Sequence, residues 1–289
     1  MFEGFVERRV ATSGPTIAAW VGGSGPPLLL LHGYPQTHVC WHLVAPALAQ
    51  HFTVVATDLR GYGDSDKPPG DKTHMAYSKR EMAKDQVEVM AALGFARFRV
   101  ASHDRGARVA HRMALDHPER VEKLAVMDIV PTREVFAAMG QRLATAYYHW
   151  FFLIQPADFP EHVIGQDPDF WVERSLAGIS RTLPFSAEAL AEYRRCFRDP
   201  AAIHASCEDY RAGASIDLVH DEADLDARIA CPLMVLWGAR AALPHFHDVE
   251  GLWQARAAGT VEGHEMPAGH FIPEEAPAET IAHLLRFMA

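Results

Sequence analysis

The sequence is poor in cysteine and has no cluster of positive charge. It contains 4 cysteines among 289 residues, and Cys40, Cys196, Cys207 and Cys231 show no C-x-x-C spacing. Scattered cysteines favour reduced thiols in a cytoplasmic protein, and they form no zinc-binding pattern. Lysine and arginine number 27 against 37 aspartates and glutamates, which gives a formal net charge of −10. Because no basic run interrupts this negative balance, nucleic acid is not an expected partner.

Long apolar segments are also missing from the sequence. The longest run, around "PPLLLLHG", is far too short to span a bilayer as a helix. The first residues, "MFEGFVERRVATSG", lack the apolar segment of a signal peptide. We therefore expect a cytoplasmic protein with no membrane partner. Repeats and low-complexity linkers are absent, and 49% hydrophobic residues suffice for one large core, with or without an appended lid.

Short apolar runs alternate with segments of helical periodicity along the first 130 residues. This alternation predicts an α/β fold with a mostly parallel sheet flanked by helices. The expected strands are "PPLLLLHG", "FTVVATDL", "FRVASHD" and "VEKLAVMDIV", and the expected helices cover 79–94 and "RGARVAHRMALDHP". Further along the chain, "CPLMVLWGA" and "TVEGHEM" predict two more strands, and "PAETIAHLLRFM" predicts a final amphipathic helix.

Residues 132–222 differ from the segments around them. They are rich in tryptophan, phenylalanine, tyrosine and arginine and have mostly helical periodicity. We interpret them as a helical cap domain inserted into a core formed by residues 1–131 and 223–289. A cap over the carboxyl ends of the strands would cover the place where open α/β sheets bind ligands.

The stretch "SHDRG" at residues 102–106 has the layout of a nucleophile elbow. This device, G-x-S-x-G in its usual form, joins a strand to a helix and exposes the side chain at its centre. Ser102 replaces the first glycine, Gly106 is the last, and Asp104 takes the position of the nucleophile. The predicted strand before it and helix after it fit that role. The simpler alternative is that Asp104 only caps the helix.

A histidine and a second acid should follow the nucleophile along the chain. The sequence has 17 histidines, and His270 is placed correctly, in a loop before the last helix. The acid can follow either of two strands. The loop after "LMVLWG" offers no carboxylate before Asp248, whereas "LAVMDIVP" provides Asp128. Asp128 is thus predicted to orient His270 and fix its tautomer, with a simple turn residue as the alternative.

The motif "HGYP" directly after an apolar strand completes the set. In such an elbow, one backbone amide from this loop and one from the residue after the nucleophile form an oxyanion hole, here Tyr34 and Arg105. Together with "DLRGYGDSDKP", "MDIVP" and "GHF", these motifs resemble the α/β-hydrolase superfamily over essentially the whole chain. The branch with an aspartate nucleophile contains haloalkane dehalogenases, epoxide hydrolases and fluoroacetate (haloacetate) dehalogenases.

Arg105 and Arg108 are unusual neighbours for such a nucleophile. A cation in the first turn of a helix opposes the helix dipole, and the haloalkane and epoxide branches usually carry tryptophan after the nucleophile. Arg108, three residues on, can reach the same face. A substrate carboxylate ~4 Å from Asp104 would be repelled by about 4 kcal/mol at intermediate dielectric, and two guanidinium groups would offset this and hold the carboxylate. The alternative is that both arginines pair only with local acids.

The chain resembles fluoroacetate dehalogenases in further motifs. In that family a His-Trp pair and a tyrosine of the cap donate hydrogen bonds to the departing halide, which implies this role for His149, Trp150 and Tyr210. Apart from the resemblance, these three residues would be interpreted as cap core. Family members carry a tryptophan where this sequence has Ile179, so the preference for halide and chain length stays open. The loop at 239–248 is unfamiliar.

The expected reaction is hydrolytic dehalogenation of short 2-haloacids, such as fluoroacetate to glycolate and fluoride. An ester on Asp104 would form and then be hydrolysed by water that His270 activates. An epoxide hydrolase, with Tyr147, Tyr148 or Tyr210 as proton donor, is the alternative enzyme. A non-catalytic sensor of small acids is a further alternative. We expect a small anionic substrate and neither a metal nor another cofactor, and homodimers through the cap are common in the family that the chain resembles.

Overall fold

A computed structural model of the chain describes residues 1–180 and 184–289, with the side chains of residues 179 and 180 left out. The side chain of Ile179 therefore lies outside the described residues. At the centre is an eight-stranded sheet in the order β1-β2-β4-β3-β5-β6-β7-β8. Its strands are β1 (Val6–Ala11), β2 (Thr16–Gly22), β3 (Pro27–Leu31), β4 (Thr53–Thr57), β5 (Phe98–His103), β6 (Val121–Met127), β7 (Leu233–Gly238) and β8 (Val261–Met266).

Six strands of the sheet, from β4 to β8 in spatial order, are parallel, as the sequence predicts. The central strand β3 is buried on both faces, which explains its unbroken run of leucines. The sequence did not predict β1 and β2, which pair antiparallel at one edge. Nearly every residue of β1 is exposed, so this edge strand lacks the apolar pattern by which buried strands are recognised.

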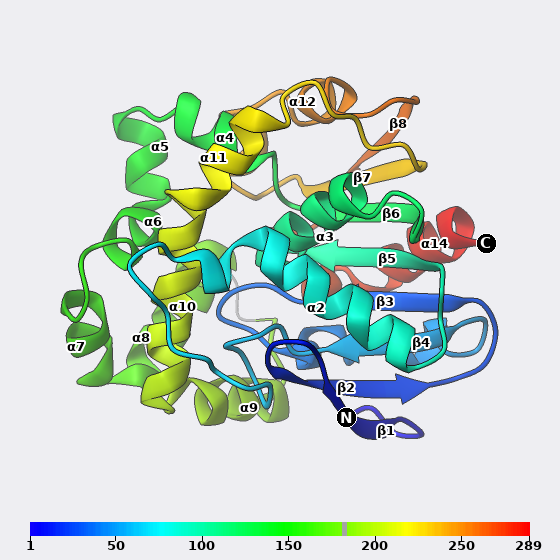
Figure 1. Ribbon diagram of the computed structural model, residues 1–289, viewed down its shortest axis with the longest axis horizontal. Helices are drawn as coiled ribbons and strands as arrows, with labels where there is room; N and C mark the ends of the chain where they lie inside the picture. Colours follow the sequence, from blue (N-terminus) through cyan, green and yellow to red (C-terminus); the bar gives the residue numbers. More distant parts are fainter. Residues whose placement is uncertain (181–183) are drawn as a thin grey trace.

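Helices cover both faces of the sheet (Figure 1). In the core they are α1 (Ala45–Leu48), α2 (Lys79–Ala92), α3 (Asp104–Asp116), α12 (Val249–Gln254), α13 (Ile272–Glu275) and α14 (Pro277–Met288), with short 3-10 turns η1 (His38–Trp41), η2 (Met75–Tyr77) and η3 (Leu243–His245). Apolar side chains of α2 and α3 pack on one face, and those of α1 and α14 pack on the other. No helix within the described residues is long and apolar enough to cross a membrane.

The segment between β6 and β7 contains eight helices and, among its described residues, no strand of the sheet. They are α4 (Thr132–Ala137), α5 (Gln141–Ala146), α6 (Tyr148–Leu153), α7 (Phe159–Gly165), α8 (Pro168–Ser180), α9 (Ala187–Phe197), α10 (Pro200–Gly213) and α11 (Ile216–Ala223). We call this segment the cap. Figure 1 shows it at the end of the sheet toward which the arrow of β5 points. The cap therefore faces the loops that follow the parallel strands.

Buried ion pairs join the cap to the core. Asp209 of α10 is fully buried and binds Lys79 at the start of α2. Lys79 also lies 3.3 Å from Asp217 of α11. Arg112 of α3 contacts Asp221 at 2.8 Å at the same end of the cap. Breaking one partner of a buried pair leaves an uncompensated charge, so these contacts hold α10 and α11 in one position on the core.

A second buried contact lies close to the end of the last strand. Glu274 of α13 accepts a hydrogen bond from the Tyr193 hydroxyl of α9 at 3.0 Å and another from the Gln36 amide. His42 lies 3.8 Å from the other carboxylate oxygen. Burial raises the pKa of Glu274 to about 8, because its hydrogen bonds from Tyr193 and Gln36 do not compensate for lost hydration.

Stability should therefore depend on the protonation of Glu274. Because the folded-state pKa of Glu274 is raised, the stability that its protonated carboxyl contributes is fully present below the ordinary pKa of glutamate. That stability is lost as the pH rises toward 8. Because glutamine mimics the protonated acid, Glu274→Gln should become more stable relative to the unchanged protein between pH 5 and pH 8. Urea unfolding at both pH values would measure this difference. Glu279→Gln, an exposed change nearby, is the control, and a difference that is constant with pH would contradict the prediction.

Candidate active site

Asp104 lies at a sharp turn between β5 and α3. Its φ of +46° is in the left-handed region that residues other than glycine rarely adopt. Two glycines make room for the turn: a Cβ on Gly33 would lie 2.4 Å from the Cβ of Asp104, and one on Gly106 would lie 2.3 Å from the His32 carbonyl oxygen. The Tyr34 amide donates to Asp104 Oδ1 at 2.8 Å. This geometry is that of the elbow, and it holds one carboxylate oxygen and leaves the other for reaction.

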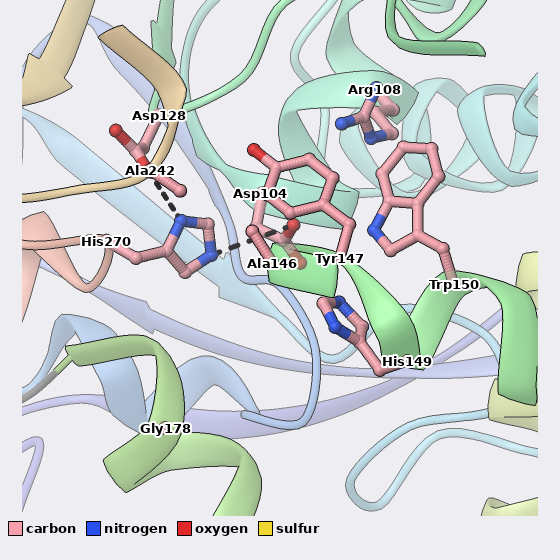
Figure 2. A pocket seen from close by; sticks show the side chains of 10 residues that line it. All are labelled: Asp104, Arg108, Asp128, Ala146, Tyr147, His149, Trp150, Gly178, Ala242 and His270. Atoms are coloured by element: carbon pink, nitrogen blue, oxygen red, sulfur yellow. Dashed lines mark hydrogen bonds and ion pairs between the residues drawn. The ribbon is translucent and has the colours of Figure 1, made fainter. Parts of the chain in front are cut away.

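Asp128 and His270 lie beside this carboxylate (Figure 2). Asp128 follows β6, also with a positive φ of +51°, and its Oδ2 is 2.6 Å from His270 Nδ1. The Gly238 amide donates to its other oxygen at 2.9 Å. His270 Nε2 is 3.8 Å from Asp104 Oδ2. Asp128 thus fixes the imidazole so that Nε2 faces the unbound oxygen of Asp104.

His103 supports the His270 loop and was not singled out in the sequence. Its Nε2 donates to the His270 backbone carbonyl at 2.7 Å, and the two rings lie 4.7 Å apart. Burial and the neighbouring His270 lower the pKa of His103 to about 3. A neutral imidazole at this position braces the His270 loop without adding a positive charge beside it.

The charges at the site favour an ionised Asp104 and a basic His270. Burial alone would raise the pKa of Asp104, but His270, His103 and the two arginines outweigh it and lower that pKa. Burial would lower the pKa of His270, but the hydrogen bond and charge of Asp128, together with the charge of Asp104, raise it above its ordinary value. Asp104 is therefore a carboxylate anion at this site, and the imidazole of His270 can accept a proton.

A cavity of about 140 Å³ lies between core and cap. Its lining combines the core residues with residues of the cap, and consists of Asp104, Arg108, Asp128, Ala146, Tyr147, His149, Trp150, Gly178, Ala242 and His270. A cavity of roughly 150 Å³ is large enough for benzene, so this one suits a ligand of a few heavy atoms. Ala242 shows that the unfamiliar loop at 239–248 contributes to the wall.

Arg105 does not line this cavity. Its guanidinium is buried and makes a two-pronged contact with Asp209, with Nε and Nη2 each 2.8 Å from a carboxylate oxygen. Asp209 raises the pKa of Arg105 despite burial. Nη1 is the guanidinium nitrogen that this contact leaves free. The sequence offered no signal for Asp209, since it lies 104 residues away in a helix of the cap.

Arg108 lines the cavity and carries no carboxylate partner within the described residues. Its Nη1 donates to the Val130 carbonyl at 3.1 Å and to the Thr132 hydroxyl at 3.0 Å, while its buried Nε has no partner there. The guanidinium lies over the Trp150 ring at 4.7 Å. Burial and the charge of Arg105 lower the pKa of Arg108. These features are typical of a cation that lacks a counterion.

The three predicted halide ligands are close together. His149 and Trp150 line the cavity, and burial lowers the pKa of His149 to about 4, so its ring is neutral near pH 7. Tyr210 does not line the cavity, but its ring lies 5.9 Å from His149 and 6.0 Å from Trp150. Tyr148, one of the alternative proton donors, is 49% exposed, whereas Tyr147 lines the cavity.

Potential metal ligands also occur away from the cavity. In the part of the chain that the structure describes, Glu262, His264 and His283 form the one group of three within reach of a common ion. Arg286 Nη2 lies 3.0 Å from His264 and 3.3 Å from His283 and also contacts Glu262. A guanidinium therefore already fills the space between these three side chains.

Comparison with known proteins identifies the fold family. Residues 26–277 match the α/β hydrolase fold family. The chain belongs to the α/β-hydrolase family. This α/β hydrolase is 48% identical over 291 residues to a fluoroacetate dehalogenase of Burkholderia sp., covering 100% of the chain and 95% of the relative. It is 35% identical over 272 residues to a soluble epoxide hydrolase of Corynebacterium sp. (strain C12), covering 92% and 91%.

A solved structure agrees with this assignment. A protein of Nostoc sp. PCC 7120, classed provisionally as an α/β hydrolase, superimposes on this α/β hydrolase with a TM-score of 0.99 at 54% identity, over 100% and 99% of the two chains. The fold class and the resemblance to fluoroacetate dehalogenases that the motifs indicated are confirmed. The comparisons do not assign the individual site residues, whose roles remain predictions.

The raised pKa of His270 provides a test of the site's electrostatics. In this α/β hydrolase, replacing Asp104 by asparagine removes one of the negative charges that raise it. We expect the pKa of His270 to be above 6.5 in the unchanged protein and to be lower in Asp104→Asn. Imidazole NMR shifts followed with pH measure both values, with His283 on α14 as internal control. Equal values for His270 in the two proteins would contradict the described charge coupling.

Proposed function

We propose that this protein is a hydrolytic dehalogenase of short 2-haloacids, acting on fluoroacetate and on chloroacetate and bromoacetate. The observation that carries the proposal is the placement of Asp104 and Arg108 in one small cavity. A carboxylate nucleophile suits displacement at saturated carbon, and a buried guanidinium without a counterion suits an anionic substrate. The 48% identity to a fluoroacetate dehalogenase supports the same conclusion.

In the first step, Asp104 Oδ2 attacks C2 of the haloacid. The C–O bond forms as the carbon–halogen bond breaks, and the halide leaves with the bonding electron pair. We propose that the halide receives hydrogen bonds from His149 and Trp150, with Tyr210 behind them. Without these donors, the halide would be unsolvated in a poorly hydrated cavity. Arg108, and the free Nη1 of Arg105, are proposed to neutralise the substrate carboxylate beside Asp104.

In the second step, water hydrolyses the ester. His270 Nε2 removes a proton from water, which attacks Cγ of Asp104, and Asp128 stabilises the imidazolium that forms. Negative charge then develops on Oδ1, the oxygen to which the Tyr34 amide already donates. The Arg105 amide is proposed as the second donor. Collapse returns the Asp104 carboxylate and releases glycolate, with a net consumption of one water and release of one proton and one halide.

Epoxide hydrolysis is the second candidate. The same three catalytic residues would serve it, and the phenol of Tyr147 in the cavity could protonate an epoxide oxygen. The 35% identity to a soluble epoxide hydrolase supports this candidate. A neutral epoxide has no use for a buried guanidinium that, among the described residues, lacks a carboxylate partner, which favours the haloacid. Turnover of styrene oxide with no halide release from haloacetates would reverse the choice.

The purified protein should release fluoride from fluoroacetate and chloride from chloroacetate. Ion-selective electrodes measure both reactions. Asp104→Asn should abolish both, because the amide is not a nucleophile. His270→Ala should form the ester and stop, which intact-peptide mass spectrometry detects as a gain of a carboxymethyl group on the Asp104 peptide. Normal turnover by His270→Ala would show that the assigned base is wrong.

The covalent route also predicts where the product oxygen originates. In a single turnover in H₂¹⁸O with excess enzyme, glycolate should be unlabelled at its hydroxyl, because that oxygen comes from Asp104. The label should appear in the Asp104 carboxylate and enter glycolate only in later turnovers. Mass spectrometry of product and peptide measures both. Label in the hydroxyl of the first product would indicate direct attack by water on the substrate.

A further inference from the structure

Tyr147 occupies a fixed position at the junction of two short helices of the cap. Its amide donates to the Leu143 carbonyl at 2.8 Å at the end of α5, and its carbonyl accepts from the Trp150 amide at 2.9 Å in α6. Its ring stacks on that of Trp150, with centroids 5.6 Å apart and planes 27° apart. Both backbone and ring are therefore held, so the direction of the phenol is set by the fold.

The phenol of Tyr147 points into the cavity that contains Asp104. In the view of Figure 2, the phenol oxygen and Arg108 lie above Asp104 and His149 lies below it, whereas the indole nitrogen of Trp150 lies beside Asp104, on the side where Arg108 also lies. Within the described residues, the hydroxyl has no hydrogen-bond partner recorded, although it lines a polar cavity. Burial and the charges of Asp128 and Asp104 raise its pKa, which keeps the hydroxyl protonated as a donor.

In-line displacement places the substrate groups relative to Asp104. The halide departs on the side of C2 opposite the attacking oxygen, and the carboxylate projects sideways from this line. Donors for the carboxylate and donors for the halide must therefore lie in different directions. In Figure 2, Arg108 and the Tyr147 oxygen lie on the side of Asp104 away from His149, and the Trp150 ring, which Arg108 overlies at 4.7 Å, lies between Arg108 and His149.

The two arginines offer the carboxylate only part of their donors. Asp209 engages two of the three nitrogens of Arg105, and Arg108 Nη1 already serves the Val130 carbonyl and the Thr132 hydroxyl. We propose that the Tyr147 hydroxyl is a ligand of the substrate carboxylate, donating to it beside Arg108. This inference rests on the proposed haloacid substrate, and it assigns to Tyr147 a part in substrate recognition rather than in halide departure.

The test compares two adjacent tyrosines. Tyr147→Phe removes one oxygen from the cavity, and Tyr148→Phe makes the same change on an exposed side chain and serves as the matched control. Acetate, which has the carboxylate but no halide, and chloride, which is the halide alone, are the probes. Equilibrium binding of each is measured by NMR titration, and KM and kcat for fluoroacetate and chloroacetate are measured by halide release.

We expect Tyr147→Phe to weaken acetate binding about tenfold, the usual effect of losing a hydrogen bond to a charged group. KM for both haloacetates should rise by a similar factor, chloride binding should be unchanged, and Tyr148→Phe should match the unchanged protein. Unchanged acetate binding overturns the inference. If chloride binding weakens instead, Tyr147 is a halide donor. If the Asp104 ester accumulates instead, Tyr147 positions the water.

Because acetate binding needs no turnover, the two proposals can fail separately. A protein that releases no halide but binds acetate, and loses affinity in Tyr147→Phe, would refute the dehalogenase and retain the carboxylate site. A protein that releases halide while Tyr147→Phe binds acetate normally would retain the dehalogenase and refute the role of Tyr147. A protein that neither binds acetate nor releases halide would refute both.

Discussion

The site is organised around one constraint, which is that Asp104 stays ionised although it is buried, in a cavity that it shares with the guanidinium of Arg108. Removing Asp104 from water disfavours its charge, and only the nearby imidazoles and guanidinium groups reverse that effect. The positive charges among these groups must lie near Asp104 without forming a direct ion pair with its carboxylate. The structure does this by distance: Tyr34 binds one oxygen through an uncharged amide, and His270 stays 3.8 Å from the other. Asp104 thereby keeps its charge while it lines the cavity.

The two arginines satisfy this constraint in different ways. Arg105 is buried against Asp209, a carboxylate that also binds Lys79 and the Tyr62 hydroxyl, so its charge is shared with a network that joins cap and core. Arg108 has only carbonyl, hydroxyl and aromatic neighbours among the described residues. Of the two alternatives drawn from the sequence, pairing with a local acid describes Arg105, and the structure places no acid on Arg108.

Chain order and strand context were enough to predict the fold family. They also predicted that Asp104, Asp128 and His270 lie together at one edge of the sheet. These residues follow three parallel strands, whose carboxyl ends meet. Features that depend on packing of the cap could not be predicted in this way. Asp209 lies in α10 and Tyr147 at the junction of α5 and α6. The periodicity does not specify how these helices are oriented, so it could not show that Tyr147 lines the cavity while Tyr148 is exposed. The exposed strand β1 was missed because it buries almost nothing.

Tyr34 belongs to both parts of the molecule at once. Its amide donates to Asp104, and its hydroxyl accepts a hydrogen bond from the indole of Trp171 in α8 of the cap. Tyr34 is thus tied at its far end to the cap, whose residues line part of the cavity. Exchanging the cap for that of a relative would therefore also affect the core: a graft without an equivalent of Trp171 removes the hydrogen bond at the far end of Tyr34, so the amide that donates to Asp104 and the lining of the cavity would change together.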